Sequence, residues 1–442
     1  MTESDALAWL AEQRIAWVET AVPDMAGVSR GKLLPVSQFE GKRFKLPIAV
    51  FGQTIHGTYY MPRDNITDRD MVIAPDLHAM RRIPWTFEPT ASVMMDCYTM
   101  DGQSVDVAPR AVLKNVIGEF ESRGWHPIVA PEVEFYLSTE CRESRSQAAF
   151  RGQADRDFER VVDPYGTDRL HDLDGFFMRL TECCRAQDIP LGAVSQELGA
   201  GQFEVNFVHG APLKLADDVF HFKRTLKALA KEHGMRATFL AKLGSEKPGS
   251  SLHVHQSVYD EQGNNIFSDS EGAPTDAFHD YLGGLQKHMA DFLLLFAPYP
   301  NSYRRLLSHW SSPVNLEWGV DNRTVALRVP DSEPAARRIE NRLAGSDVNP
   351  YLTIAGTLAC GFLGMTEKTE CRPPVPDSAW DFPFALHRHL YEALEALRQS
   401  RAARKMLGQA FVDQYVAVKE REWHELAQRV PPWELNELSV VI

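Results

Sequence analysis

Three segments of the sequence, over 131–137, 196–207 and 251–257, place acidic residues or histidines among apolar residues. Within an extended strand, successive side chains point to opposite faces. Polar residues two positions apart therefore share one face, and the apolar residues between them pack behind. In the middle segment a glycine-rich turn separates two glutamates. The polar residues that this pattern singles out are Glu132, Glu134, Glu197, Glu204, His253 and His255.

Several carboxylates that face one cavity repel one another and would have to take up protons unless a cation compensates them. Ligands that are mainly oxygen favour Mg²⁺ or Mn²⁺. The pattern therefore indicates a divalent metal site, with solvated outer faces of sheets as the competing interpretation. An iron oxygenase or cupin-like barrel is another alternative, because His253-x-His255 with a distant glutamate resembles a two-histidine, one-carboxylate site. The excess of glutamates favours the harder ion.

Arginines gather in two later segments, over 301–330 and 336–345. Guanidinium groups are the usual protein partners of carboxylates and phosphates. A helix is predicted over 334–343, on which Arg338 and Arg342 share a face. The sequence has no G-x-x-x-x-G-K-[ST] motif and no G-x-G-x-x-G motif after a strand, so arginines and metal would have to hold any nucleotide. A metal site beside an anion site suits phosphoryl transfer, although surface ion pairs would also explain any single arginine.

The composition argues against several classes of protein. With 47 basic and 60 acidic residues the net charge is −13, which disfavours nucleic acid as a partner because phosphate binding needs a basic surface. No apolar run reaches the roughly eighteen residues of a membrane-spanning helix. The chain starts with acidic residues, unlike a secretory signal, and its six cysteines lack disulfide or metal spacing. We therefore expect reduced thiols and a cytoplasmic location.

A chain of 442 residues is too long for one ordinary hydrophobic core, so at least two domains are predicted. A mostly β unit ends near residue 103, and helices alternate with strands from residue 107 onward, which predicts an α+β fold. The polar segment 141–158 is interpreted as a mobile insertion. Helices are expected over 4–13, 109–123, 172–187, 213–233, 277–297, 334–343, 350–365 and 384–428, and strands over 15–22, 46–61, 71–74, 92–98, 126–138, 202–208, 236–241, 251–259 and 324–329.

Six motifs resemble, in their order and spacing, those of the glutamine synthetases. They are PEVEFYL, QELGAGQFEVNF, SLHVHQS, NSYRRL, NRTVALRVP and ARRIENRLAGSDVNPYL. The resemblance extends to about residue 365 and implies a small N-terminal β-grasp domain (1–103). It also implies a catalytic domain (104–442) with a funnel-like antiparallel sheet wrapped by helices. Stacked hexameric rings, hence a dodecamer, are implied as well, with each active site completed by a neighbour's N-terminal domain.

The resemblance further implies a reaction and a role for individual residues. Glutamate attacks ATP to give γ-glutamyl phosphate, and an amine then displaces phosphate to form the amide. Two or more Mg²⁺ or Mn²⁺ ions are implied, one held by Glu134, Glu197 and Glu204 and a second by Glu132, His253 and Glu340. The other implied roles are ATP contacts for His255, Ser257 and Arg338, glutamate contacts for Gly249, Arg305 and Arg342, and stabilisation of the transferring phosphoryl group for Arg323 and Arg328.

The sequence departs from the ammonia-using glutamine synthetases where these bind ammonium. An aspartate is missing from VFGQTI (50–55), and Ser311 stands where a glutamate is expected. Small Ser311 beside Trp310 would leave space and an apolar wall for an alkyl chain. We therefore predict a polyamine or alkylamine acceptor, as in the γ-glutamylpolyamine synthetases. The alternative is a true glutamine synthetase in which another acid, such as Asp64 or Glu317, replaces the lost pair.

A catalytically inactive structural relative is an alternative of a different class. All six implied metal-ligand positions are kept, which argues against it. Pro248 replaces an asparagine that is common in the family, and this affects the expected glutamate pocket rather than the metal site.

Overall fold

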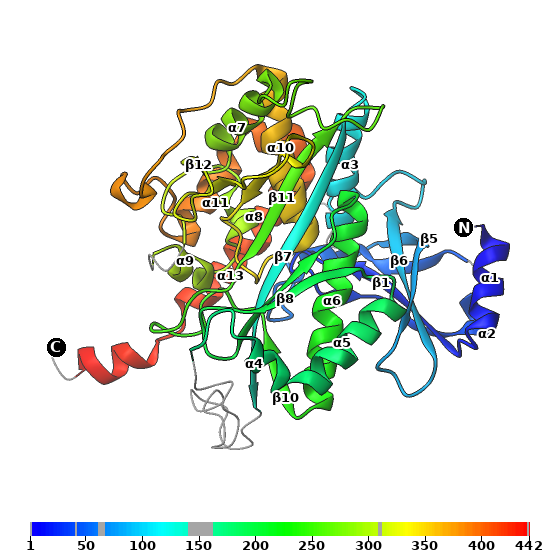
Figure 1. Cartoon of the computed structure of the whole chain (residues 1–442). Helices are drawn as coiled ribbons and strands as arrows, with labels where there is room; N and C mark the ends of the chain where they lie inside the picture. Colours follow the sequence, from blue (N-terminus) through cyan, green and yellow to red (C-terminus); the bar gives the residue numbers. More distant parts are fainter. Residues whose placement is uncertain (1, 40–41, 61–66, 140–161, 308–311, 440–441) are drawn as a thin grey trace.

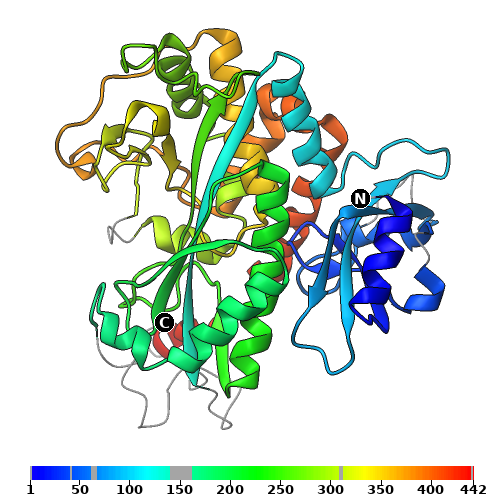
Figure 2. The ribbon, with the colours of Figure 1, turned by 45° about the vertical axis from the view of Figure 1, so that its right-hand side comes forward.

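The computed structural model describes residues 2–39, 42–60, 67–139, 162–307, 312–439 and 442 (Figure 1). Its N-terminal sheet has six strands in the order β2-β1-β6-β5-β4, with β3 paired to β1. Figure 2 shows this sheet to one side of a larger part built from a second sheet and most of the helices. The strands are β1 (Trp17–Pro23), β2 (Ser29–Arg30), β3 (Leu33–Pro35), β4 (Phe44–Pro47), β5 (Asp70–Ile83) and β6 (Thr90–Tyr98).

The second sheet has eight strands in the order β12-β13-β14-β11-β7-β9-β8, with β10 paired to β7. The long strands β7 and β11 lie side by side at its centre (Figure 1). Their apolar residues, such as Val133 and Val254, are fully buried on one face. The strands are β7 (His126–Thr139), β8 (Leu191–Gln196), β9 (Gln202–Phe207), β10 (Met235–Thr238), β11 (Leu252–Tyr259), β12 (Trp318–Val320), β13 (Leu327–Val329) and β14 (Ile339–Asn341).

Helix α10 (Pro350–Glu367) is the central helix of the core and is buried from Pro350 to Met365. It begins at Asn349, whose side chain accepts hydrogen bonds from two backbone N–H groups of the first turn, with proline at the first helical position. It packs against α3, α6 and α7. The other helices of at least ten residues are α1 (Glu3–Glu12), α3 (Pro109–Glu121), α5 (Asp174–Ala186), α6 (Pro212–Glu232), α7 (Asp276–His288), α11 (Leu390–Gln399) and α13 (Gln409–Ala427).

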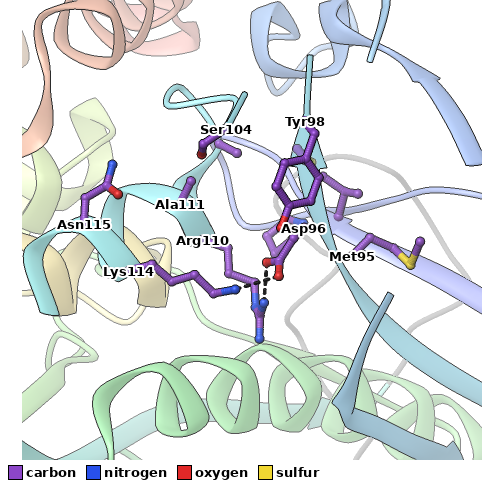
Figure 3. A pocket seen from close by; sticks show the side chains of 12 residues that line it. Met95, Asp96, Tyr98, Ser104, Arg110, Ala111, Lys114 and Asn115 are labelled. Carbon is purple, nitrogen blue, oxygen red and sulfur yellow. Dashed lines mark hydrogen bonds and ion pairs between the residues drawn. The ribbon is translucent and has the colours of Figure 1, made fainter. Parts of the chain in front are cut away.

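A buried charge network joins the N-terminal sheet to the part built around the eight-stranded sheet. Arg110, only 3% exposed, reaches Asp76 and Asp96 on the N-terminal sheet at 2.6 Å and Asp217 of α6 at 3.0 Å. Lys114, one turn further along α3, also pairs with Asp96, and Figure 3 shows both cations directed at this carboxylate. We call Arg110, Asp76, Asp96 and Asp217 the Arg110 network. It links side chains of the two parts through one guanidinium group.

Most predicted elements are confirmed, including the α+β class with an N-terminal β part. The strand expected over 46–61 is wrong beyond Pro47, because β4 ends there and a 3₁₀ helix (Ile48–Gly52) follows. The predicted helix over 334–343 is wrong, because a 3₁₀ turn (Pro334–Ala336) is followed there by strand β14. The strand β8 was not predicted. The segment 141–158 lies outside the described residues. None of the helices that the structure describes is long and apolar enough to cross a membrane.

Candidate active site

The polar residues of the three strand segments meet on one face of the eight-stranded sheet. In the antiparallel register Glu132 of β7 lies opposite His253 of β11, and Glu134 lies opposite Glu204 of β9. On the other side of β11, Glu340 of β14 lies opposite His255. Directly opposed residues share a face, so four neighbouring strands present acids and imidazoles together. We call this surface the acid-lined face.

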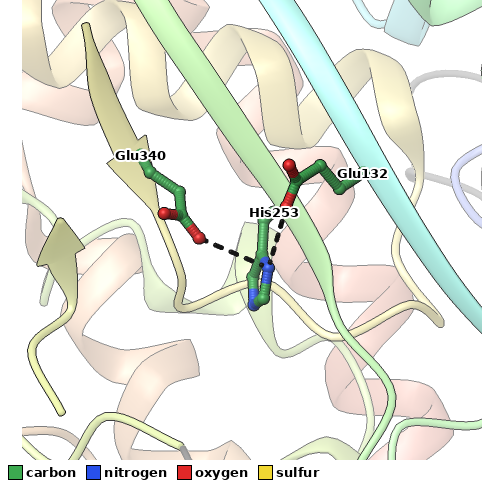
Figure 4. A group of neighbouring side chains, drawn as sticks. All are labelled: Glu132, His253 and Glu340. Carbon is green, nitrogen blue, oxygen red and sulfur yellow. Dashed lines mark ion pairs between the residues drawn. The ribbon is translucent and has the colours of Figure 1, made fainter. Parts of the chain in front are cut away.

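Two histidines and two glutamates form the first cluster on this face. His253 Nδ1 lies 3.5 Å from Glu132 and 3.4 Å from Glu340, as Figure 4 shows, and His255 Nε2 lies 3.0 Å from Glu132. Burial raises the pKa of Glu132, but hydrogen bonds with both histidines outweigh it and hold this pKa well below its usual range. Burial and then Arg342 lower the pKa of His253 to about 4, so the imidazole is neutral at physiological pH. A neutral imidazole is the form that binds metal.

The second cluster has more carboxylates than cations. Burial, reinforced by the charge of Glu197, raises the pKa of Glu134 to about 8. Burial and the charge of Glu132 raise the pKa of Glu204 to about 9. The pKa of Glu197 is raised as well, first by burial. These carboxylates therefore compete for protons because the protein itself supplies too little positive charge beside them.

The donor set fits divalent cations. One oxygen or nitrogen each from Glu132, His253 and Glu340 lie within 4.8 Å of one another, and the same holds for Glu134, Glu204 and His253. In the described residues His253 Nε2 is buried and has no hydrogen-bond partner. Buried carboxylates with raised pKa values and an unpartnered imidazole nitrogen are the groups that a cation would satisfy. Glu197 belongs to neither close group, although its charge acts on Glu134.

Arginines border the acid-lined face along β13 and β14. Arg328 donates to Glu340 at 2.9 Å and to Asp321 at 2.8 Å. Arg342 also donates to Glu340, and Arg338 contacts His255 Nδ1 at 3.3 Å. The sequence placed Arg338 and Arg342 on one face of a helix. They instead flank β14, whose alternation still turns Arg338, Glu340 and Arg342 to the same side.

Arg305 of α9 (Pro300–Leu306) is buried beneath this region and is 2% exposed. It donates to the carbonyls of Leu343 and Arg342 at 2.9 Å and to Ser251 Oγ at 2.8 Å. Burial lowers its pKa to about 10. Gly249 packs against it, since a Cβ on Gly249 would lie 2.6 Å from Arg305 Cγ. The close approach of these two predicted glutamate-binding positions therefore requires glycine.

The remaining predicted positions are spread around the face. Ser257 is buried on β11, in alternation with His253 and His255. Arg323 is exposed, and its charge acts on Glu197. Trp310, Ser311 and Asp64 lie outside the described residues. Glu317, the other acid considered for the amine site, pairs with Arg372 at 3.0 Å.

Several groups that support the acid-lined face were not predicted from the sequence. Gln202 donates to Glu134 Oε2 at 3.3 Å and to the Gly249 carbonyl at 2.9 Å, and Ser251 N donates to Glu134 at 2.8 Å. The hydroxyl of Ser346 donates to the Glu134 carbonyl at 2.6 Å. The alternation of positions 202, 204 and 206 along β9 would have identified Gln202, whereas Ser346 carries no comparable signal.

Comparison with known proteins agrees with this geometry. The sequence pattern described as glutamine synthetase, catalytic domain, matches residues 106–438. The chain therefore belongs to the glutamine synthetase family. Membership indicates a ligase that acts on glutamate, with small-molecule substrates, ATP and divalent metal.

Individual relatives include ligases named for amines and proteins named glutamine synthetase. A glutamate–isopropylamine ligase of Pseudomonas sp is 33% identical over 83% of this chain and 80% of the relative. A type-1 glutamine synthetase of Dictyostelium discoideum is 32% identical over 96% and 84%. A γ-glutamylputrescine synthetase of Escherichia coli is 30% identical over 95% and 91%. The ligand-free structure of GmaS superimposes with a TM-score of 0.85 at 25% identity and covers 98% of both chains.

Proposed function

We propose that this protein joins the γ-carboxylate of L-glutamate to a polyamine or alkylamine, using ATP and forming γ-glutamyl phosphate on the way. The observation that carries the proposal is the acid-lined face, where Glu134, Glu197 and Glu204 have raised pKa values and arginines stand alongside. Two anions, a carboxylate and a triphosphate, have to approach each other in this reaction. A surface that collects divalent cations and guanidinium groups makes that approach possible.

In this proposal Glu134, Glu197 and Glu204 hold one divalent cation, and Glu132, His253 and Glu340 hold another. When bound, Mg²⁺ or Mn²⁺ would neutralise charge on the phosphates. Arg323 and Arg328 stabilise the transferring phosphoryl group, since guanidinium forks match phosphate oxygens. His255, Ser257 and Arg338 contact ATP, and Gly249, Arg305 and Arg342 position glutamate. The neutral state of His253 keeps one ring nitrogen available as a ligand.

The chemistry then needs two displacements. The glutamate carboxylate oxygen attacks the terminal phosphorus of ATP, and ADP leaves. The amine nitrogen attacks the γ-carbonyl carbon, phosphate leaves, and the nitrogen loses a proton. An aliphatic amine with a pKa near 10.4 is only about one part in two thousand neutral at pH 7, so an acceptor for its proton is required.

The identity of the amine substrate is proposed from two observations. Val50 and Phe51 line the region where ammonia-using relatives are expected to place an acid, and both are buried. Two similar relatives are named for isopropylamine and putrescine. Trp310 and Ser311 are proposed to line the amine pocket. We further propose a cytoplasmic dodecamer of two hexameric rings with domains 1–103 and 104–442, supported by family membership and by five free cysteines in the described residues.

An amine panel tests the proposal. Purified protein with glutamate, ATP and Mg²⁺ is expected to release phosphate with putrescine, spermidine or isopropylamine at a kcat/KM at least about tenfold above that with ammonia, because the missing acids no longer favour ammonium. Omitting glutamate is the control. If ammonia is the best acceptor, the protein is a true glutamine synthetase. If no amine supports phosphate release, the protein is an inactive relative, and bound iron in metal analysis would favour the oxygenase.

A further inference from the structure

A second cavity lies away from the acid-lined face, between the N-terminal part and the catalytic part. Its volume is about 770 Å³, and its wall comes from residues 26–29 and 55–56 on one side and from α6, β10, α9 and α13 on the other. We call it the Lys223 cavity. None of the described residues with a predicted catalytic, metal-binding, ATP-binding or glutamate-binding role lines it. Its basic lining residues are Lys223, Arg224, Lys227, Arg236 and Arg304, together with His56.

The positive charge of this wall exceeds its negative charge. Two carboxylates, Asp347 and Glu422, are the acids that line the cavity. Glu422 is already compensated, because Lys419 Nζ lies 2.8 Å from it and it accepts the Ile55 N–H at 2.7 Å. Burial raises the pKa of Asp347, which favours its neutral form. In a chain with a net charge of −13, such a cationic wall is not what the overall composition would produce.

Among the described residues, several of these cations have no carboxylate as an ion-pair partner. Within the part of the chain that the structure describes, the side chains of Lys227, Arg236 and Arg304 form no ion pair. Arg224 pairs with Glu19 at 2.7 Å through Nη2, but its Nη1 is buried without a hydrogen-bond partner. Cations that share one cavity without counter-ions raise each other's energy, and a bound anion would remove that cost.

Lys223 is half-buried in this group. Its ammonium donates to the carbonyls of Ser346 and Val348 at 2.7 and 3.0 Å and lies 5.2 Å from the ring centre of Phe239. Burial, and then the charge of Lys227, lower the pKa of Lys223 to about 7. An ammonium held by two neutral carbonyls retains attraction for an anion in front of it.

Much of the remaining wall is apolar. Phe239 and Phe220 each carry a cation over the ring, at 5.5 Å for Lys227 and 5.6 Å for Arg224. Leu240, Tyr299 and Leu390 extend this lining. A cavity of this size with an apolar wall and a few charged groups suits a small organic molecule rather than a bare ion.

We propose that the Lys223 cavity binds a small organic anion that carries carboxylate or phosphate oxygens on an apolar body. The oxygens would lie among Lys223, Lys227, Arg236 and Arg304, and the apolar body would contact Phe239 and Leu240. This site is distinct from the glutamate site. Arg304 is exposed on the cavity side, whereas the adjacent Arg305 is buried among main-chain carbonyls.

Calorimetric titration of the full-length protein tests the site. Phthalate and phenyl phosphate separate carboxylate from phosphate recognition, benzamide is the uncharged control, and inorganic phosphate lacks the apolar body. The titrations are done in EDTA without nucleotide or glutamate, so that neither the metal centre nor catalysis contributes. At least one of the two organic anions is expected to bind at least tenfold more tightly than benzamide and inorganic phosphate.

Matched variants locate the binding. Lys227→Ala with Arg236→Ala is expected to weaken the bound anion at least tenfold, and both residues are exposed, so the fold should persist. Arg401→Ala with Lys405→Ala removes the same charge from another exposed surface and is expected to change affinity less than twofold. Equal loss in both double variants, loss in Arg323→Ala instead, or no binding at millimolar concentration would each overturn the proposal. None of these outcomes depends on ligase activity.

Discussion

The protein contains two clusters of carboxylates in which pKa values are shifted in opposite directions. In the Arg110 network three aspartates surround one arginine, and Arg110 with Lys114 lowers the pKa of Asp76 despite its burial. On the acid-lined face the pKa values of Glu134 and Glu204 rise to about 8 and 9. Both clusters use the same side-chain chemistry in similar burial, so the difference lies in whether the chain supplies the cations.

This difference separates a structural cluster from a functional one. A network whose cations are built in can stabilise the fold without any partner, and it joins elements from both parts of the chain. A cluster left short of positive charge costs stability until a cation arrives from outside. We therefore expect substitutions on the acid-lined face to change mainly activity, and substitutions in the Arg110 network to change mainly stability. For one pair of substitutions, the changes in stability should have opposite signs.

The largest expected effect is on activity. Glu134→Ala or Glu204→Ala is expected to lower amine-dependent phosphate release at least about 10³-fold, because each removes a proposed ligand from the group that neutralises the phosphates. Steady-state kinetics with saturating Mg²⁺ measures this. Asp76→Ala removes a carboxylate of the Arg110 network and serves as the control. The activity of the Asp76→Ala variant should stay within tenfold of the parent's activity. Near-parental activity of Glu134→Ala would contradict the division of roles.

The next effect is on stability. Arg110→Ala leaves buried Asp217 and its two neighbours without their shared cation, and breaking a buried pair this way costs about 3–5 kcal/mol. The midpoint of urea unfolding is expected to fall clearly below that of the parent. Lys287→Ala breaks a half-exposed pair with Glu367 and is expected to cost under about 1 kcal/mol. Equal midpoints for the two variants would show that the Arg110 network does not hold the parts together.

A smaller expected effect is that stability depends on pH when the metal is absent. Glu134 and Glu204 keep protons in the folded state up to about pH 8 and 9, whereas in the unfolded chain they release them near pH 4.5. The folded state therefore binds more protons between these values, and metal-free stability falls as pH rises through this window. The lowered pKa of His253, about 4, acts only below about pH 6.5 and does not interfere above pH 7.

Thermal unfolding at pH 7 and pH 9, in EDTA and in Mg²⁺, measures this linkage. The EDTA sample is expected to lose about 3–4 kcal/mol between the two pH values. Mg²⁺ should raise the Tm more at pH 9, where it does not compete with protons for the carboxylates. A Mg²⁺ gain that is equal at both pH values would mean that these glutamates are not the ligands.

The composition of the acid-lined face was predictable from the sequence because it depends on strand alternation, which is local. Glu132, Glu134, His253 and His255 share a face in any extended strand of that sequence. Which strands become neighbours was not predictable from alternation. The order β14-β11-β7-β9 brings Glu340 beside His255, and the segment around Glu340, which is rich in the helix formers Ala and Arg, was predicted as a helix. Pairing with β11 and β13 overrides that propensity.

The Arg110 network and the Lys223 cavity carry no sequence signal. Asp76, Asp96, Arg110 and Asp217 are separate in the sequence, and each alone is an ordinary charged residue. Their proximity follows from the docking of the N-terminal sheet on α3 and α6, which is a tertiary event. Family membership and the α+β fold were predicted correctly from the motifs. The acceptor remains a prediction, because Trp310 and Ser311 lie outside the described residues.

The smallest expected effect is a change in the free energy of unfolding, whose sign differs between the two clusters. Glu204→Gln keeps the shape of the side chain and can still accept the hydrogen bond from Asn206, which is 3.2 Å long in the parent. It removes one repelling carboxylate, so metal-free protein at pH 9 is expected to gain under about 1 kcal/mol. Asp76→Asn removes an attracted carboxylate and should lower stability under the same conditions. Paired urea titrations in EDTA compare the two variants. A loss in both would place Glu204 in a cluster that is already neutralised by the chain, and the requirement for an external cation would then disappear.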